Sequence, residues 1–133
     1  MYLLDTNVCI SLMKDQYPAL TAKVLSMDPS LLFISSVTVF ELEYGASKSQ
    51  QSERMRFQLM MFLSAFTVLP FDADDAFAAG RIRADMAANG TAIGPYDLQI
   101  AAQGLSRKLT VVTHNTGEFS RVNGLQLEDW VSY

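Results

Sequence analysis

The chain has 133 residues, of which 50% are hydrophobic and 18% are charged, and this composition excludes an intrinsically disordered protein. Ten basic and 14 acidic residues give a formal net charge of −4, which argues against a simple basic nucleic-acid binder. This length suits one domain with its own core, so we expect a single domain over residues 1–133.

Two features favour a cytoplasmic protein. Cys9 is the only cysteine and cannot form an intramolecular disulfide, as is usual in a reducing compartment. The chain reaches Asp5 after three apolar residues, and its longest dense apolar stretch, 59–63, is much too short to span a bilayer. We therefore expect neither a signal peptide nor a membrane segment.

Short apolar runs alternate with longer helical patterns along the chain. In chain order, these patterns predict a strand over 2–4, helices over 8–13 and 19–27, a strand over 32–34, helices over 37–48 and 49–66, a strand over 67–69, helices over 73–89 and 95–108, a strand over 110–112, a short helix over 117–122 and an edge strand over 125–127. Ser36 is the expected N-cap of the helix over 37–48. The alternation predicts the α/β class, as a three-layer α/β/α sandwich with a small, mainly parallel central sheet.

Three acidic residues fall where a parallel sheet binds ligands, beyond the carboxyl ends of its strands. Asp5 directly follows the first strand, and Glu41 lies in the second turn of the helix after the second strand. Asp97 is the third residue of the helix over 95–108, so it joins the other two if that helix starts at the same edge. Glu43 lies roughly 200° around the helix from Glu41, so we expect it to be peripheral.

Two further polar residues, Asn115 and Glu118, follow the strand over 110–112. Each acid also has an ordinary structural interpretation. Asp5 is suited to cap the helix that follows it, and Asp97 is favoured near any helix N-terminus by the macrodipole. Asn115 and Glu118 have the spacing of a capping box, so Glu118 is either a member of the site or a cap of its own helix.

The convergence of these acids points to a metal ion. Two carboxylates about 5 Å apart repel by roughly 3 kcal/mol at an effective dielectric constant near 20, and a bound cation removes that cost. Oxygen ligands suit Mg²⁺ or Mn²⁺, whereas a chain with one histidine and one cysteine is a poor candidate for zinc or for a Ser-His-Asp triad. A hard cation held by carboxylates predicts phosphate-ester hydrolysis.

An ordered set of motifs covers nearly the whole chain. They are Leu4-Asp5-Thr6-Asn7, Ile34-Ser35-Ser36-Val37-Thr38, Glu41-Leu42, Tyr44-Gly45-Ala46, Ile93-Gly94-Pro95-Tyr96-Asp97, Ile100-Ala101-Ala102, Val112-Thr113-His114-Asn115, Glu118-Phe119, Gly124-Leu125 and Glu128-Asp129-Trp130. In this set the sequence resembles the PIN-domain ribonucleases, and more narrowly the VapC-type toxins of bacterial toxin–antitoxin pairs.

The resemblance implies a PIN-like fold and a set of site residues. Asp5, Glu41 and Asp97 would be the catalytic acids and metal ligands. Supporting hydrogen bonds would come from Thr6, Asn7 and Thr113. Many PIN domains carry a fourth aspartate where this chain has Asn115, so the fourth ligand would be either the carbonyl oxygen of Asn115 or the carboxylate of Glu118.

The implied activity is a Mg²⁺- or Mn²⁺-dependent endoribonuclease toxin that cuts structured RNA. The expected substrate is transfer RNA, including initiator transfer RNA near the anticodon, and the expected partners are a cognate antitoxin and a second copy of the chain. The alternatives are a catalytically weak PIN-like interaction module and another Mg²⁺-dependent phosphate-ester hydrolase. A dehalogenase-like phosphatase is disfavoured because Asn7 stands where such an enzyme needs an aspartate.

The helix predicted over 49–66 is apolar around most of its circumference, as is typical of a helix that is wholly buried or shared with a partner. Methionine-rich surfaces adapt well to partner helices. We expect a partner surface, with burial in the protein's own core as the alternative. The candidate residues of that surface are Met55, Leu59, Met60, Phe62 and Leu63.

Overall fold

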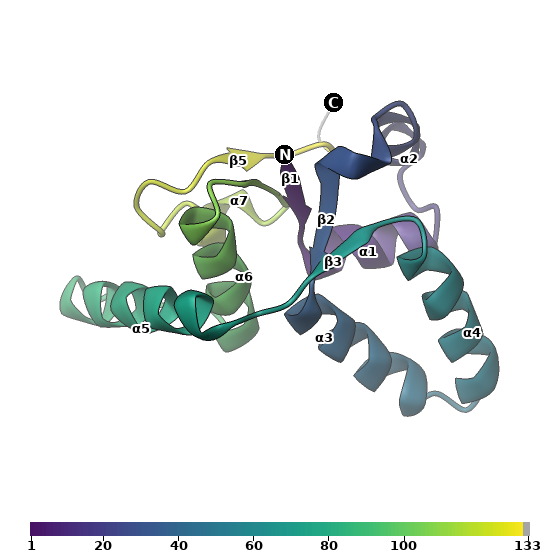
Figure 1. Cartoon of the computed structure of the whole chain (residues 1–133), viewed down its shortest axis with the longest axis horizontal. Helices are drawn as coiled ribbons and strands as arrows, with labels where there is room; N and C mark the ends of the chain where they lie inside the picture. Colours follow the sequence, from purple (N-terminus) through teal and green to yellow (C-terminus); the bar gives the residue numbers. More distant parts are fainter. Residues whose placement is uncertain (132–133) are drawn as a thin grey trace.

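A five-stranded sheet forms the centre of the computed structural model, which describes residues 1–131 (Figure 1). Its strands are β1 (Tyr2–Leu4), β2 (Leu32–Ser35), β3 (Thr67–Leu69), β4 (Thr110–Val112) and β5 (Leu127–Glu128). They pair in the order β3-β2-β1-β4-β5, and every pairing is parallel. The first strand therefore lies in the middle of the sheet, with the register Leu4 to Ile34 on one side and Leu4 to Val112 on the other.

Helices connect these strands and cover both faces of the sheet. They are α1 (Thr6–Met13), α2 (Pro18–Leu25), α3 (Ser36–Ser47), α4 (Ser52–Leu63), α5 (Ala73–Ala88), α6 (Pro95–Ser106) and α7 (Thr116–Phe119), with a 3₁₀ turn over Pro29–Leu31. In Figure 1, α5, α6 and α7 lie on one side of the sheet and α1, α2 and α4 on the other.

Successive strand residues point to opposite faces of the sheet, so each strand feeds two cores. Leu4, Ile34 and Val112 pack with residues of α1, α2 and α4 and with Trp130. Leu3 and Val111 pack on the other face with residues of α5, α6 and α7. These two cores confirm the predicted three-layer α/β/α sandwich.

Several predicted boundaries are wrong by two or three residues, including the end of the short helix predicted over 117–122, which is observed at Thr116–Phe119. Ser35, not Ser36, caps α3, because its hydroxyl accepts the amide of Val37, while the Ser36 hydroxyl accepts the amide of Phe71 at the end of β3. Helix α4 begins three residues later and ends three residues earlier than the predicted 49–66. The last strand pairs at Leu127–Glu128, because its register is set by β4 and not by its own apolar pattern.

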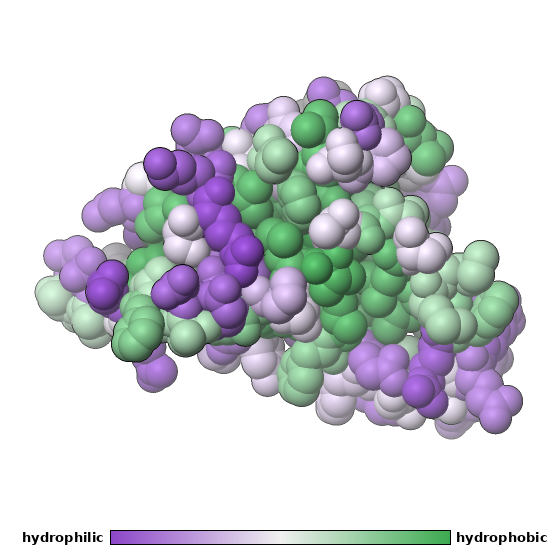
Figure 2. All heavy atoms as spheres, in the orientation of Figure 1, coloured by the Kyte–Doolittle hydropathy of each residue, from purple (hydrophilic) through white to green (hydrophobic). Residues whose placement is uncertain are grey.

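Part of α4 and the edge strand β3 remain uncovered. On the face of the molecule seen in Figure 2, an apolar area lies in the part where Figure 1 places β3 and α4. Val68, Phe57, Met60 and Met61 are exposed here, with exposed fractions from 38% to 63%. The accessible surface is 7672 Å², whereas a compact protein of this mass is expected to have about 6,900 Å².

The five residues predicted for a partner surface differ in their burial. Leu59 is buried in the protein's own core, which corrects its assignment, and Phe62 and Leu63 pack half-buried against that core. Met55 and Met60 are exposed as predicted. Within residues 1–131, no helix combines the length and apolar character that crossing a membrane requires.

Candidate active site

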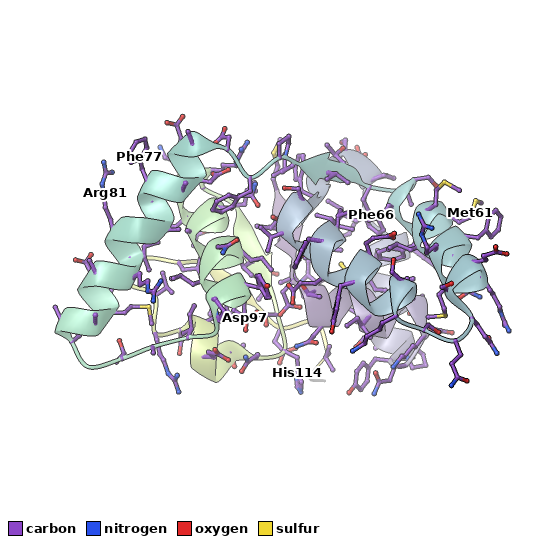
Figure 3. All side chains as sticks on the ribbon, turned by 90° about the horizontal axis from the view of Figure 1, so that it is seen from below. Met61, Phe66, Phe77, Arg81, Asp97 and His114 are labelled. Carbon is purple, nitrogen blue, oxygen red and sulfur yellow. The ribbon has the colours of Figure 1, made fainter. Side chains whose placement is uncertain are left out.

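The parallel sheet brings the predicted acids to one end of the molecule. Asp5 is the N-cap of α1 directly after β1, and Glu41 lies on α3 after β2. Asp97 lies in the first turn of α6, and Glu118 lies on α7 after β4. Figure 3 views this end, with Asp97 on α6 near the middle and the α3–α4 pair on the opposite side from α5.

Asp5 caps α1 and also lies near another of the predicted site acids, Glu41. Its carboxylate is 2% exposed, and Oδ1 accepts the backbone amide of Val8 at 2.7 Å, which caps α1. Oδ2 accepts the hydroxyl of Thr113 at 2.5 Å. Burial raises the pKa of Asp5, the hydrogen bonds from Thr113 and Val8 oppose that rise, and the charge of Glu41 adds to it. The carboxylate is therefore rigidly held and faces another acid.

Glu41 is held by one threonine hydroxyl. Thr6 donates to Glu41 Oε1 at 2.7 Å, and the Thr6 side chain is itself largely buried. Asn7 behaves differently from Thr6 and Thr113, because its side chain is exposed and its contribution to Asp5 comes from the backbone amide. Two of the three predicted supporting residues thus bond a site carboxylate through their side chains.

Asp97 is the least restrained of the three central acids. Burial is the largest cause that raises its pKa, and together with the charges of Glu118, Asp5 and Glu41, in that order, it brings the pKa to about 6. No hydrogen bond from residues 1–131 offsets these effects. Because all three other acids act on Asp97, the four carboxylates share one electrostatic environment.

Glu118 forms one tertiary and one local hydrogen bond instead of the capping box that its spacing allows. Its Oε1 accepts the backbone amide of Gly94 at 2.7 Å, and its Oε2 accepts Nδ2 of Asn115 at 2.7 Å. These bonds lower the pKa of Glu118, so the carboxylate is charged. Gly94 is the N-cap of α6, and Glu118 therefore anchors the helix that carries Asp97.

Gly94 lies next to two of the acids. A Cβ there would stand 3.7 Å from Oδ2 of Asp97 and 3.8 Å from Oε1 of Glu118. The two carboxylates therefore lie close to the same backbone atom, and the missing side chain leaves the space next to them open.

The donor set fits a hard divalent cation, because every group at the centre is a carboxylate oxygen. Among residues 1–131, however, no three His, Cys, Asp or Glu side chains stand close enough to coordinate one ion together. To bind a cation, at least one of these acids would have to turn inward. Asp97, which lacks a hydrogen bond, is the one that can turn most easily.

Other polar residues near this end have structural partners. His114 Nδ1 lies 3.0 Å from Oδ2 of Asp129. Glu43 forms an ion pair with Arg56 at 2.8 Å, so it joins α3 to α4 away from the central acids, as predicted.

The residue that sequence reasoning missed is Thr38. Its hydroxyl lies 3.0 Å from the hydroxyl of Thr6, and it is 0% exposed. Thr38 precedes Glu41 by three residues and so shares a helix face with it, a spacing that could have identified it.

A search of protein families gives the class to which this fold and these acids belong. The PIN-domain profile matches residues 2–125, so the chain belongs to the PIN-domain family. This confirms the resemblance read from the sequence motifs.

Within that family, the relatives are VapC proteins. The chain is 45% identical over 129 residues to the tRNA(fMet)-specific endonuclease VapC of Shigella flexneri, a match that covers 97% of each chain. It is 43% identical to the protein of the same name in Salmonella typhimurium, with the same coverage.

Solved structures give the same result. A chain of the DNA-bound VapBC complex from Salmonella typhimurium superposes with a TM-score of 0.92 at 42% identity, covering 97% of both chains. A chain of VapBC2 from Rickettsia felis, bound to a fragment of promoter DNA, has a TM-score of 0.88 at 33% identity and covers 97% of this chain and 98% of that one.

Proposed function

We propose that this protein is the endoribonuclease toxin of a toxin–antitoxin pair and that it requires Mg²⁺ or Mn²⁺. The observation that carries the proposal is the convergence of Asp5, Glu41 and Asp97, with the pKa of Asp97 raised by burial and by the charges of the other acids. The relatives named as tRNA(fMet)-specific endonucleases support initiator transfer RNA as the substrate, and the proposal places the cut near the anticodon. The cytoplasm is the compartment that suits such a substrate and a buried free thiol.

In this proposal, Asp5, Glu41 and Asp97 bind the cation, and Glu118 or Asn115 contributes a fourth oxygen. When bound, the cation would activate a water molecule and neutralise the charge that develops on the phosphate. The residues of the chain fix the geometry for that chemistry. Thr113 orients Asp5 and Thr6 orients Glu41, and neither carboxylate has to be reorganised during the reaction.

The test is cleavage of initiator transfer RNA and of total RNA, with Mg²⁺, with Mn²⁺ and with EDTA. Wild type is expected to cut in either metal and not in EDTA. Asp5→Ala and Asp97→Ala are expected to lose at least 100-fold in rate, because each removes a proposed ligand. Glu43→Gln is the matched control, since it removes a nearby acid that pairs with Arg56. Equal cleavage by all four proteins would refute the mechanism.

We propose that the exposed part of α4 is covered by the cognate antitoxin. The relatives with solved structures are VapBC toxin–antitoxin complexes. Phe57 and Met60 stand 59% and 63% exposed here, beside a cavity of about 590 Å³ between α3 and α4. Phe57→Ser combined with Met60→Ser should weaken antitoxin binding at least tenfold without lowering RNA cleavage by the free protein. Titration of the purified antitoxin against both proteins measures this.

The proposal includes a homodimer. The basic residues are scattered in the sequence, and two copies side by side could combine them into one basic surface that binds RNA. The molar mass in solution, measured by light scattering, tests the dimer. A dimer-disrupting change that left RNA affinity intact would contradict the shared basic surface.

A further inference from the structure

Thr38 lies on α3, and its side chain contacts Thr6 and not one of the central acids. Its side chain is fully buried, and its hydroxyl oxygen is 3.0 Å from that of Thr6, 32 residues away in sequence. Thr6 in turn donates to Glu41 Oε1 at 2.7 Å. The three side chains therefore form a chain from the protein interior to the site.

The protons in this chain can be counted. A threonine hydroxyl has one proton to donate and lone pairs to accept with. Thr6 gives its proton to Glu41, so it has none left for Thr38. The contact of 3.0 Å between the two hydroxyls must then be a hydrogen bond in which Thr38 donates and Thr6 accepts.

We propose that Thr38 is a positioning residue that acts on Glu41 through Thr6. Its donated proton occupies a lone pair of the Thr6 oxygen and so fixes the direction of the Thr6 proton towards Glu41. Glu41 is then held by Oε1 in the orientation that the proposed cation requires. This inference rests on the proposed function, because it concerns how tightly the site binds that cation.

The other held carboxylate shows the same two-step arrangement. Thr113 donates to Asp5, and the backbone amide of Asn115 donates to Thr113 at 3.0 Å. Each of these carboxylates thus has a threonine that orients it and a second donor that orients the threonine. On the Asp5 side the second donor is a backbone amide, whereas on the Glu41 side it is the side chain of Thr38, which substitution can remove.

Burial gives the Thr38 proton few other acceptors. A buried hydroxyl without a partner is costly, and Thr38 Oγ1 is not among the unpartnered buried atoms of residues 1–131. Valine has nearly the shape of threonine and lacks the hydroxyl. Thr38→Val therefore removes the donor with little change in packing, and Thr38→Ser keeps the donor.

The experiment measures Mn²⁺ affinity by isothermal titration calorimetry in full-length protein. Removing a partner that orients a metal ligand typically costs about 10–100-fold in metal affinity. We expect Thr38→Val to weaken Mn²⁺ binding about tenfold at the low end of that range and Thr38→Ser to restore most of it. Thr21→Val is the matched control, because Thr21 donates to Asp15 on the surface away from the site.

A double substitution separates positioning from general destabilisation. If Thr38 acts only through Thr6, adding Thr38→Val to Thr6→Val should cause no further loss of Mn²⁺ affinity. A further tenfold loss in the double variant, or wild-type affinity in Thr38→Val, would overturn the inference and leave the proposed function standing. A wild-type protein that fails to bind Mn²⁺ would overturn both.

Discussion

Replacing Asp97 with asparagine is expected to stabilise the metal-free protein at neutral pH. The pKa of Asp97 is about 6 in the folded protein, against an ordinary value of 3.8. The folded state therefore favours the protonated acid. The stability that the protonated form of Asp97 contributes is fully present below pH 3.8 and is lost as the pH rises through about 6. At pH 7.5 the negative charge of Asp97 lowers the free energy of unfolding, and the neutral amide of asparagine does not.

The pKa difference sets the size of the effect. At full strength the difference between 3.8 and about 6 corresponds to about 3 kcal/mol. Asp97 is partly exposed, and screening by solvent reduces this to about 1–2 kcal/mol. For a chain of this length, that gain in the free energy of unfolding raises the melting temperature by about 3–8 °C.

The assay is thermal unfolding in EDTA at pH 7.5 and at pH 4, comparing wild type with Asp97→Asn. The gain should be present at pH 7.5 and should shrink to a small fraction at pH 4, where wild-type Asp97 is mostly protonated. Asp85→Asn, at an exposed acid of α5, is the control for the removal of one charge and should show no such gain. Added Mn²⁺ should stabilise wild type more than Asp97→Asn.

Two results would refute this reasoning. If Asp97→Asn were no more stable than wild type at pH 7.5, neither burial nor repulsion by the other acids would destabilise charged Asp97 in the folded protein. If the gain were equal at pH 7.5 and pH 4, it would come from packing or hydrogen bonding and not from the charge of Asp97.

Three further substitutions probe the surroundings of the site. Glu118→Gln keeps an acceptor for the Gly94 amide at the start of α6 but removes a charge. It should weaken Mn²⁺ binding several-fold with little change in melting temperature. A lower melting temperature with unchanged Mn²⁺ affinity would indicate a purely structural role. Thr113→Val should lower the free energy of unfolding by about 1–3 kcal/mol. The hydrogen bond from Thr113 lowers the pKa of Asp5, so its loss should raise that pKa and shift the pH profile of RNA cleavage to higher pH. Arg107→Ala leaves buried Asp75 without its ion pair at 2.9 Å and should cost about 2–4 kcal/mol in urea unfolding at pH 7. Mn²⁺ affinity should stay unchanged, and the deficit should shrink in acid, because the pKa of Asp75 is lowered in the folded protein.

The sequence predicted the convergence of the acids because a parallel sheet brings all its strand ends to one edge. Asp5, Glu41 and Asp97 could be placed there by counting residues after each strand or from a helix start. Contacts between elements could not be found in this way. Glu118 has the local spacing of a cap, yet it bonds the amide of Gly94, 24 residues earlier, because the fold brings α7 against the start of α6.

Hydroxyl networks were harder to predict than charges. A cluster of acids is conspicuous in a sequence, and its electrostatic cost implies a ligand. A buried threonine such as Thr38 looks like any β-branched residue of a helix core, and its role depends on the approach of α1 to α3. The boundaries of α4 were overestimated at both ends: the apolar pattern continues into Ala65 and Phe66, which form a turn, and at the start the hydroxyl of Ser49 accepts the amide of Gln51 in another turn.

The central position of β1 has a consequence for synthesis on the ribosome. Asp5 is made 108 residues before Thr113, whose hydroxyl orients it. The site can be completed only after β4 has been made and has paired with β1, and parallel pairings over such distances form slowly. Helix α4 is made well before β4. A growing chain therefore displays its apolar helix to a partner before its carboxylates can be assembled, and a copy that stops short of β4 lacks a complete site.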